Sequence, residues 1–248
     1  MCLILIAWQA HPRYSLVVAA NRDEFHDRPA AVAEFWDENP DILAGKDLQA
    51  GGTWLGISKS GRFAAISNYR EPSYKNLGPE YSRGHLVREF LFDNSAPGLY
   101  AESLQTCGKY YRGFNILVGN RDSLFYFSNR KDRPVKVGPG CHGLSNHLLN
   151  TDWPKVHSGR DQLNSVLQNE KINPDSLLDL LTKRSTSLTT EELKSKPERM
   201  NERIFIDSPV YGTRSSTVLL IENNGDTIFV EQQFDTQGNP GNRREHQF

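Results

Sequence analysis

Two strand-length apolar runs near the start of the chain place the strongest constraint on its fold. Residues 3–8 and 15–20 are almost continuously apolar, and the short stretch His11-Pro12-Arg13 separates them. Because the side chains of a β-strand alternate between two faces, a run without polar positions has to be buried on both faces. The pattern predicts a β-hairpin in the interior of a layered fold.

Further strand and helix signals follow this hairpin along the chain. Strands are predicted over 53–58, 62–68, 114–118, 123–127, 204–206, 216–221 and 227–234, and helices near 82–91, 97–104, 152–168 and 174–182. The turn Asn224-Gly225 between the last two strands is the strongest hairpin signal. Strands at both ends with helices between them predict one α+β domain over residues 1–234, in which the terminal strands share a sheet.

Two segments carry no regular pattern. Residues 28–50 read as an irregular loop that ends at Gly51-Gly52. Residues 235–248 are polar and contain glycine and proline, so we expect a disordered tail.

Composition excludes several classes of function. The formal net charge of the 248-residue chain is −1, with 29 basic and 30 acidic residues and no long basic stretch, which disfavours nucleic acid as a partner. The apolar runs are too short for a transmembrane segment. Three scattered cysteines indicate neither a disulfide framework nor a zinc site and fit the cytoplasm. No particular oligomeric state is predicted.

Cys2 is the strongest candidate for chemistry. If Met1 is removed, Cys2 carries both a thiol and a free α-amine. The amine titrates near ~7.7–8.0 and can act as the general base for its own thiol, so nucleophile and base lie on one residue. The alternative is that Cys2 is a small apolar residue at the start of a buried strand.

The polar cluster Asn21-Arg22-Asp23-Glu24 ends the second apolar run. A tight hairpin would bring this cluster next to Cys2. Arg22 would then favour the thiolate, and Asp23 or Glu24 would orient the amine or the guanidinium. The alternative is a solvated turn with a local ion pair that adds little stability.

Other polar side chains end predicted strands or precede them. Asn68 and Asn146 could donate hydrogen bonds to a developing oxyanion, although each could equally be a turn residue. Arg214 precedes a late strand and is a further charged candidate. The histidines lack metal-ligand spacing, and the chain contains no phosphate loop, GxSxG or CxxC motif. No metal and no cofactor is therefore predicted.

These motifs resemble those of the NRDE family, also called the transport and Golgi organisation 2 family. The resemblance rests on Met1-Cys2, Ala20 to Glu24, Gly51 to Gly56, Ser67 to Pro72, His142 to Asn146 and Tyr211 to Ser215. The motifs occur in order and span nearly the whole chain. The family in turn resembles the N-terminal-nucleophile hydrolases, especially the cysteine amidases that cleave bile-salt conjugates and penicillin V.

The resemblance implies a four-layer αββα sandwich and a set of site residues. Cys2 would be the nucleophile that attacks a non-peptide amide, with Arg22 and Asp23 beside it. The implied oxyanion donors are Asn68 and Asn146, and Arg214 would be a second arginine of the site. Three residues of the same motifs are expected to contact the substrate: Glu24, Trp54 and Tyr69. In the amidases an aspartate follows the arginine by three positions, whereas this chain has Phe25 there.

The resemblance also implies a non-catalytic alternative. The family has been linked to intracellular haem handling and to membrane traffic, so the fold could carry a haem or another small molecule. Haem would need a thiolate or imidazole ligand and an apolar slot. The side chains considered for this role are Cys2, His11, His26, Cys141 and His142.

Overall fold

A computed structural model describes residues 2–71, 81–184 and 197–248. The described residues form two compact units, each built from separate stretches of the chain. The first unit takes its residues from 1–28, 139–144 and 150–248, and the second from 29–138 and 145–149. Each unit contains one sheet and helices, so the predicted α+β class is confirmed.

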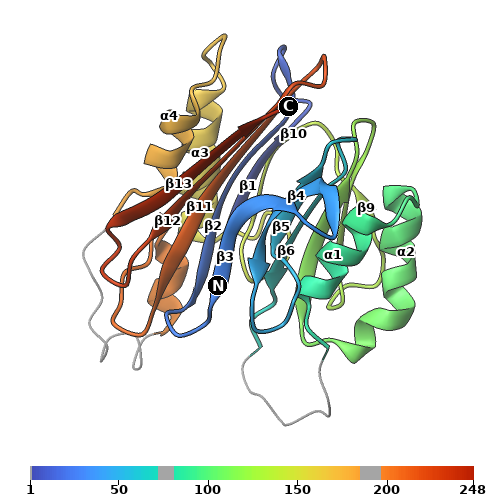
Figure 1. Ribbon diagram of the computed structural model, residues 1–248, viewed down its shortest axis with the longest axis horizontal. Coiled ribbons are helices and arrows are strands. Elements are labelled where there is room, and N and C mark those ends of the chain that lie inside the picture. The colour runs from blue at the N-terminus through green and yellow to red at the C-terminus, as the bar shows by residue number, and fades with distance from the viewer. Residues whose placement is uncertain (1, 72–80, 185–196) are drawn as a thin grey trace. The chain divides into compact units, whose positions relative to one another are not determined.

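The first unit contains a six-stranded antiparallel sheet in the order β10-β1-β2-β11-β12-β13 (Figure 1). Its strands are β1 (Cys2–Trp8), β2 (Tyr14–Phe25), β10 (Gly140–Leu144), β11 (Tyr211–Glu222), β12 (Thr227–Phe234) and β13 (Pro240–Gln247). The predicted first hairpin is confirmed, with Ile4 opposite Ala20. The chain returns to this hairpin after about two hundred residues, because β11 pairs along nearly the whole length of β2.

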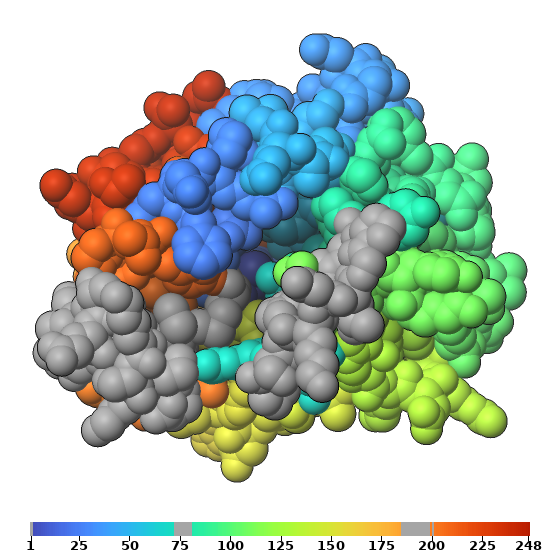
Figure 2. Space-filling view, turned by 90° about the horizontal axis from the view of Figure 1, so that it is seen from below, coloured from blue at the N-terminus to red at the C-terminus, as the bar shows by residue number. Residues whose placement is uncertain are grey.

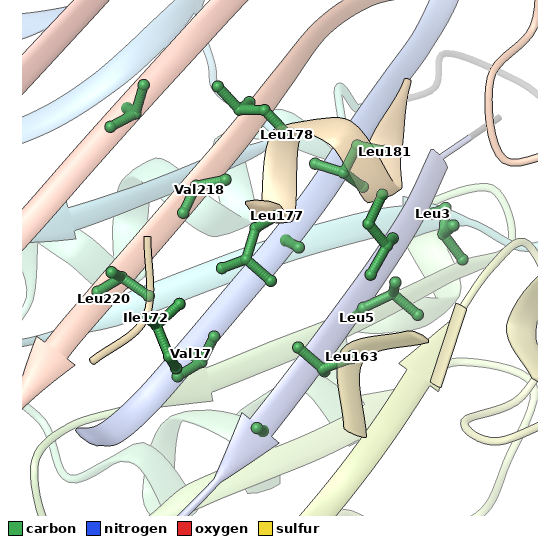
Figure 3. Packing of buried hydrophobic residues seen from close by; sticks show 14 of the residues in the cluster. Leu3, Leu5, Val17, Leu163, Ile172, Leu177, Leu178, Leu181, Val218 and Leu220 are labelled. Carbon is green, nitrogen blue, oxygen red and sulfur yellow. The ribbon is translucent and has the colours of Figure 1, made fainter. Parts of the chain in front are cut away.

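Two helices, α3 (Pro154–Val166) and α4 (Pro174–Leu181), cover one face of this sheet, and a 3-10 helix, η2 (Pro197–Glu202), follows them. Figure 3 shows leucine side chains of the two helices, together with Ile172 from the segment before α4, packed on leucine and valine side chains of β1, β2 and β11. Leu3 and Leu5 of β1 point to these helices, whereas Ile4 and Ile6 point to the opposite face and are buried as well. Burial on both faces explains the continuous apolar runs.

The second unit contains a seven-stranded sheet in the order β3-β4-β5-β6-β7-β8-β9. Its strands are β3 (Ala30–Trp36), β4 (Asn39–Asp47), β5 (Leu55–Ser58), β6 (Phe63–Asn68), β7 (Phe114–Gly119), β8 (Leu124–Ser128) and β9 (Val135–Lys136). One face packs on α1 (Gly84–Phe92) and α2 (Pro97–Cys107), and η1 (Gly108–Tyr110) follows α2. Within the described ranges, no helix has the length and apolar character needed to cross a membrane.

The predicted irregular loop over 28–50 is wrong, because this segment forms β3 and β4. Polar residues, Pro40 and Gly45 interrupt the apolar alternation there and hide the strands. The hairpin is closed by side chains: Trp36 Nε1 donates to Ala44 O at 2.9 Å, and Lys46 pairs with Glu38 at 2.6 Å.

The predicted disordered tail is also not observed, because residues 240–247 form the edge strand β13 on β12. Asp235 Oδ1 accepts hydrogen bonds from Gln237 N and Asn239 N, both at 2.8 Å, and so shapes the turn between the strands. Nearly all of β13 is exposed, so it needs no apolar alternation. Its charged residues are typical of an edge strand that must not pair with other chains.

Gly52 is packed tightly, although the sequence suggests a flexible Gly51-Gly52 pair. A Cβ atom on Gly52 would lie 2.4 Å from the carbonyl carbon of Gly84 at the start of α1. Neither backbone can move freely, because Gly84 O accepts from Thr53 N and Gly52 O accepts from Asp47 N.

We therefore expect Gly52→Ala to lower the free energy of unfolding by about 1–3 kcal/mol through overpacking. The control is Gly138→Ala, where the added methyl group meets nothing within 4 Å, and which should change stability by less than about 0.5 kcal/mol. Urea unfolding measures both variants. Equal stability of the two would contradict this packing.

Candidate functional site

The register of three strands brings Cys2, Arg22 and Ser215 into one row. Cys2 of β1 lies opposite Arg22 of β2, and Arg22 lies opposite Ser215 of β11. Residues opposite one another in antiparallel strands share a face of the sheet. The row lies on the face away from α3 and α4, because the neighbouring Leu3 and Asn21 point to the helices. The predicted proximity of Cys2 and Arg22 is therefore confirmed.

A β-bulge at Arg214 produces this arrangement. Thr213 lies opposite Asp23 and Ser215 lies opposite Arg22, so Arg214 is an extra residue in β11. In a regular strand, Thr213 and Ser215 would share a face. The extra residue instead gives each face of the sheet one polar side chain at this end, and bulges often re-aim side chains in this way near functional sites.

Asp23 is buried on the helix side of the sheet, with 2% of its surface exposed. Thr213 Oγ1 donates to Asp23 Oδ1 at 2.7 Å, and the Tyr211 hydroxyl donates to Asp23 O at 2.7 Å. Burial raises the pKa of Asp23, while the positive charge of the N-terminus, the charge of Lys155 and the Thr213 hydrogen bond act in the opposite direction. Lys155 belongs to the first turn of α3 and is 1% exposed.

The surroundings of Cys2 disfavour its thiolate. Burial raises the pKa of the Cys2 thiol above its ordinary value, and the negative charge of Asp23 raises it further. The positive charge of the N-terminus, the Asp23 backbone hydrogen bond and the Arg22 charge lower the pKa but do not cancel these effects. The thiol therefore needs a base before it can act as a nucleophile near neutral pH.

Arg214 and Glu24 hold the end of the β2–β11 pair. Arg214 Nη1 donates to His26 O at 2.7 Å and to Phe25 O at 3.4 Å. Glu24 Oε1 accepts from Phe25 N at 2.9 Å, and its Oε2 lies 4.0 Å from Arg28 Nε. Glu24 thus forms the local ion pair that was the alternative for this cluster. Figure 2 shows the end of β2 (blue) and the start of β11 (orange) side by side at the surface.

The second unit brings Asn68 and Asn146 together. Asn146 Nδ2 donates to Asn68 O at 3.0 Å, and Asn146 O accepts from Arg70 N at 2.8 Å. Asn146 is 1% exposed and has a φ of +48°, a left-handed conformation that asparagine tolerates better than most residues. Asn68, in contrast, ends β6 with an exposed side chain.

Tyr69 and Trp54 lie in different surroundings within this unit. The Tyr69 hydroxyl is 3.1 Å from His147 Nε2, and the two rings are 5.0 Å apart. Trp54 packs against the hydrophobic core below α1, where a Cβ atom on Gly45 would meet its ring at 2.5 Å. Trp54 thus lies against the core cluster of this unit, whereas Tyr69 lies beside the asparagine pair.

Sequence reasoning missed Thr213, Ser215 and Lys155. The first two belong to a motif that was recognised, but only the bulge gives them different faces. Lys155 has no sequence signal, because a lysine at the start of an amphipathic helix is ordinarily exposed. Its burial beside Asp23 depends on the packing of α3 on the sheet.

Two of the histidines considered for haem, His11 and His26, are engaged in hydrogen bonds. His11 uses both ring nitrogens, with Nε2 on Asn169 O at 2.9 Å and Nδ1 accepting from Arg13 N at 3.1 Å. His26 Nε2 is bound to Ser208 O at 2.9 Å. Among the residues that the structure describes, no group of three or more His, Cys, Asp or Glu could hold a metal ion. Because both of its ring nitrogens are engaged, His11 does not fit an axial-ligand role.

Comparison with known proteins agrees with the sequence motifs. The profile of the family described as Transport and Golgi organisation 2 matches residues 1–236. A relative from Mus musculus, named Transport and Golgi organization 2 homolog, is 34% identical over 257 residues, covering 94% of this chain and 92% of the relative.

Solved structures of similar fold are named as an acylase and a hydrolase. The mutant C2A of conjugated bile acid hydrolase from Clostridium perfringens matches with a TM-score of 0.55 and 9% identity, covering 100% of this chain and 92% of that chain. Penicillin V acylase from Agrobacterium tumefaciens matches with a TM-score of 0.52 and 12% identity, covering 92% and 82%. At these identities the likeness shows the fold alone, which is that of the N-terminal-nucleophile hydrolases.

The opposite effects of Arg22 and Asp23 on the Cys2 pKa give a test. At one fixed pH, iodoacetamide should alkylate Cys2 faster in Asp23→Asn, which removes a charge that raises the pKa, and slower in Arg22→Gln. Peptide mass spectrometry resolves Cys2 from Cys107 and Cys141, whose unchanged rates show that each variant is folded. The same direction of change in both variants would contradict the arrangement.

The Thr213 hydrogen bond should make stability depend on pH. Since the folded-state pKa of Asp23 is raised, Asp23 stabilises the protein at acidic pH and this contribution is lost as the pH rises through that pKa. The Thr213 hydroxyl donates its hydrogen bond to the ionised carboxylate of Asp23. Thr213→Val should therefore lower the free energy of unfolding by about 1.5–3 kcal/mol at alkaline pH and by less at acidic pH.

Chemical denaturation across a pH series measures this difference. The control is the same substitution in an Asp23→Asn background, where the pH dependence of the loss should disappear. A loss that is equal at all pH values would show that Thr213 acts only through Ile206 N, from which its Oγ1 accepts a hydrogen bond at 3.0 Å.

Proposed function

Since this chain belongs to the transport and Golgi organisation 2 family and has the fold of N-terminal-nucleophile hydrolases, we propose that it hydrolyses a non-peptide amide. Cys2 is the proposed nucleophile after removal of Met1, which lies outside the described residues. The observation that carries the proposal is the row of Cys2, Arg22 and Ser215, formed by strands β1, β2 and β11. Fold likeness alone would not support an activity.

The raised pKa of the Cys2 thiol supports a base on the same residue. Once Met1 is removed, the α-amine of Cys2 takes the thiol proton, and the sulfur attacks the amide carbonyl. The amine then returns the proton to the leaving nitrogen, which leaves a thioester. Water attacks the thioester with the amine again as base and releases the acid.

The remaining polar residues have proposed roles that follow from their chemistry. Arg22, beside the nucleophile in the row, favours the thiolate, and the buried Asp23 orients the α-amine from the same strand end. The side-chain amides of Asn68 and Asn146 are the proposed oxyanion donors. Tyr69 and Glu24 are proposed to contact the substrate, while Arg214 fixes the backbone that follows Asp23.

The proposed location is the cytoplasm. All three cysteines are free thiols, which fits a reducing compartment.

Two measurements test the proposal. The intact mass of purified, untagged protein should be short by one methionine, and a panel of non-peptide N-acyl amides should contain a substrate that wild type hydrolyses. Cys2→Ala should abolish this hydrolysis and Cys2→Ser should reduce it strongly, whereas Cys141→Ser should retain it.

Unchanged hydrolysis in Cys2→Ala would overturn the proposed nucleophile. Retention of Met1 in functional protein would block the α-amine, and the non-catalytic carrier of a small molecule would then be the better hypothesis.

A further inference from the structure

A chain of buried hydrogen bonds crosses the sheet of the second unit below its asparagine pair. Asn115 Nδ2 on β7 donates to Ser67 Oγ on β6 at 3.4 Å, and Asn115 Oδ1 accepts from the Tyr126 hydroxyl on β8 at 2.8 Å. The same hydroxyl accepts from the backbone N–H of Leu149 at 3.2 Å. The chain therefore runs through four residues on three strands and one loop.

The side chains joined by these hydrogen bonds are buried, and they lie on the face of the sheet opposite the helices. Ser67, Asn115 and Tyr126 are between 0% and 2% exposed. Their neighbours Ile66, Ile116 and Phe127 point to α1 and α2, so the polar side chains occupy the opposite face of the sheet. Buried polar groups of this kind are costly unless every member has a partner, and a satisfied network fixes one arrangement.

The direction of the hydrogen bonds is determined at Tyr126. Leu149 N–H can only donate, so the hydroxyl accepts there and uses its own hydrogen for Asn115. The Asn115 amide is thereby oriented with its NH₂ group toward Ser67. Burial raises the pKa of Tyr126 to about 12, so the hydroxyl keeps this hydrogen across the working range of pH.

Both ends of this series of hydrogen bonds lie next to an asparagine of the proposed site. Ser67 directly precedes Asn68, and Leu149 follows Asn146 by three residues in the segment 145–149. The asparagine segments also meet directly, because Asn146 Nδ2 donates to Asn68 O. Together with this contact, a closed ring of hydrogen bonds and backbone segments is formed through Ser67, Asn115, Tyr126 and Leu149.

We propose that Tyr126 is a positioning residue that holds the segments carrying Asn68 and Asn146 in a single relative arrangement. The role rests on the proposed function, in which these asparagines donate to the oxyanion. Neither asparagine is bonded to Tyr126, so the hydroxyl acts through Leu149 on one side and through Asn115 and Ser67 on the other. The segment 145–149 is flanked in the chain by residues of the first unit, so non-covalent contacts of this kind hold it in the second unit.

Tyr126→Phe tests the proposal, since it keeps the ring and removes only the hydroxyl. We expect the backbone N–H of Leu149 to exchange with solvent at least about tenfold faster, which corresponds to about 1.4 kcal/mol. In ¹⁵N-correlated NMR spectra, the backbone and side-chain amide signals of Asn68 and Asn146 should also shift.

The matched control is Tyr100→Phe. The Tyr100 hydroxyl is buried in the same unit and donates to Leu86 O at 2.6 Å. This variant should leave the exchange of Leu149 and the signals of both asparagines as in wild type. If Tyr126→Phe does not fold, Ser67→Ala, which alters the other end of the chain, should shift the same asparagine signals.

Unmoved asparagine signals in Tyr126→Phe would overturn the proposal even if Leu149 exchanges faster, and so would equal effects in Tyr100→Phe. These readouts need no turnover, so they hold in inactive Cys2→Ala protein and are independent of the proposed nucleophile. With an amide that wild type hydrolyses, Tyr126→Phe should lower kcat and leave KM unchanged, because oxyanion donors act in the transition state.

Discussion

The antiparallel pairing of β2 with β11 is the interaction on which the rest of the first unit depends. It places β2 in the middle of the sheet, where its apolar residues are buried on both faces, and it sets Ser215 opposite Arg22 and Thr213 opposite Asp23. The bulge at Arg214 then places Thr213 and Ser215 on opposite faces of the sheet at one end of this strand pair. Thr213 donates to one carboxylate oxygen of Asp23 on the helix side, and Ser215 joins the row of Cys2 and Arg22 on the other side. A register shift by one residue would exchange these faces and dismantle both arrangements.

The charges at this end of the β2–β11 pair affect both the stability of the fold and the ionisation of the Cys2 thiol. A buried carboxylate is unfavourable by itself, and the fold offsets this with the Thr213 hydroxyl and the cation of Lys155. The same carboxylate makes the Cys2 thiol harder to ionise, which would be a disadvantage if the thiol worked without a base. An α-amine on Cys2 removes that disadvantage, so the electrostatics and the proposed removal of Met1 support each other.

The sequence allowed prediction of the elements that are periodic and of the residues that lie at strand ends. The continuous apolar runs predicted the first hairpin, and pairing within that hairpin was enough to place Arg22 opposite Cys2. Long-range packing was out of reach, since the burial of Lys155 depends on where α3 docks and the opposed faces of Thr213 and Ser215 depend on a bulge. Tyr126 carried no signal either, because an aromatic residue in a strand is expected to be core. The polar strand β13 and the interrupted β3 and β4 lacked the alternation that pattern analysis requires.

The interleaved composition of the two units has a consequence for how the chain acquires its structure. Asn21 bonds Ser216, a partner 195 residues away, so β2 is without its neighbour on that side until most of the chain has left the ribosome. Contacts of such sequence separation slow folding, and unpaired apolar strands are prone to aggregate in the meantime. The second unit likewise acquires residues 145–149 only after β10 has been made for the first unit. We therefore expect a slow, chaperone-assisted folding reaction in which the two units are completed together, and in which neither can be produced as a separate fragment.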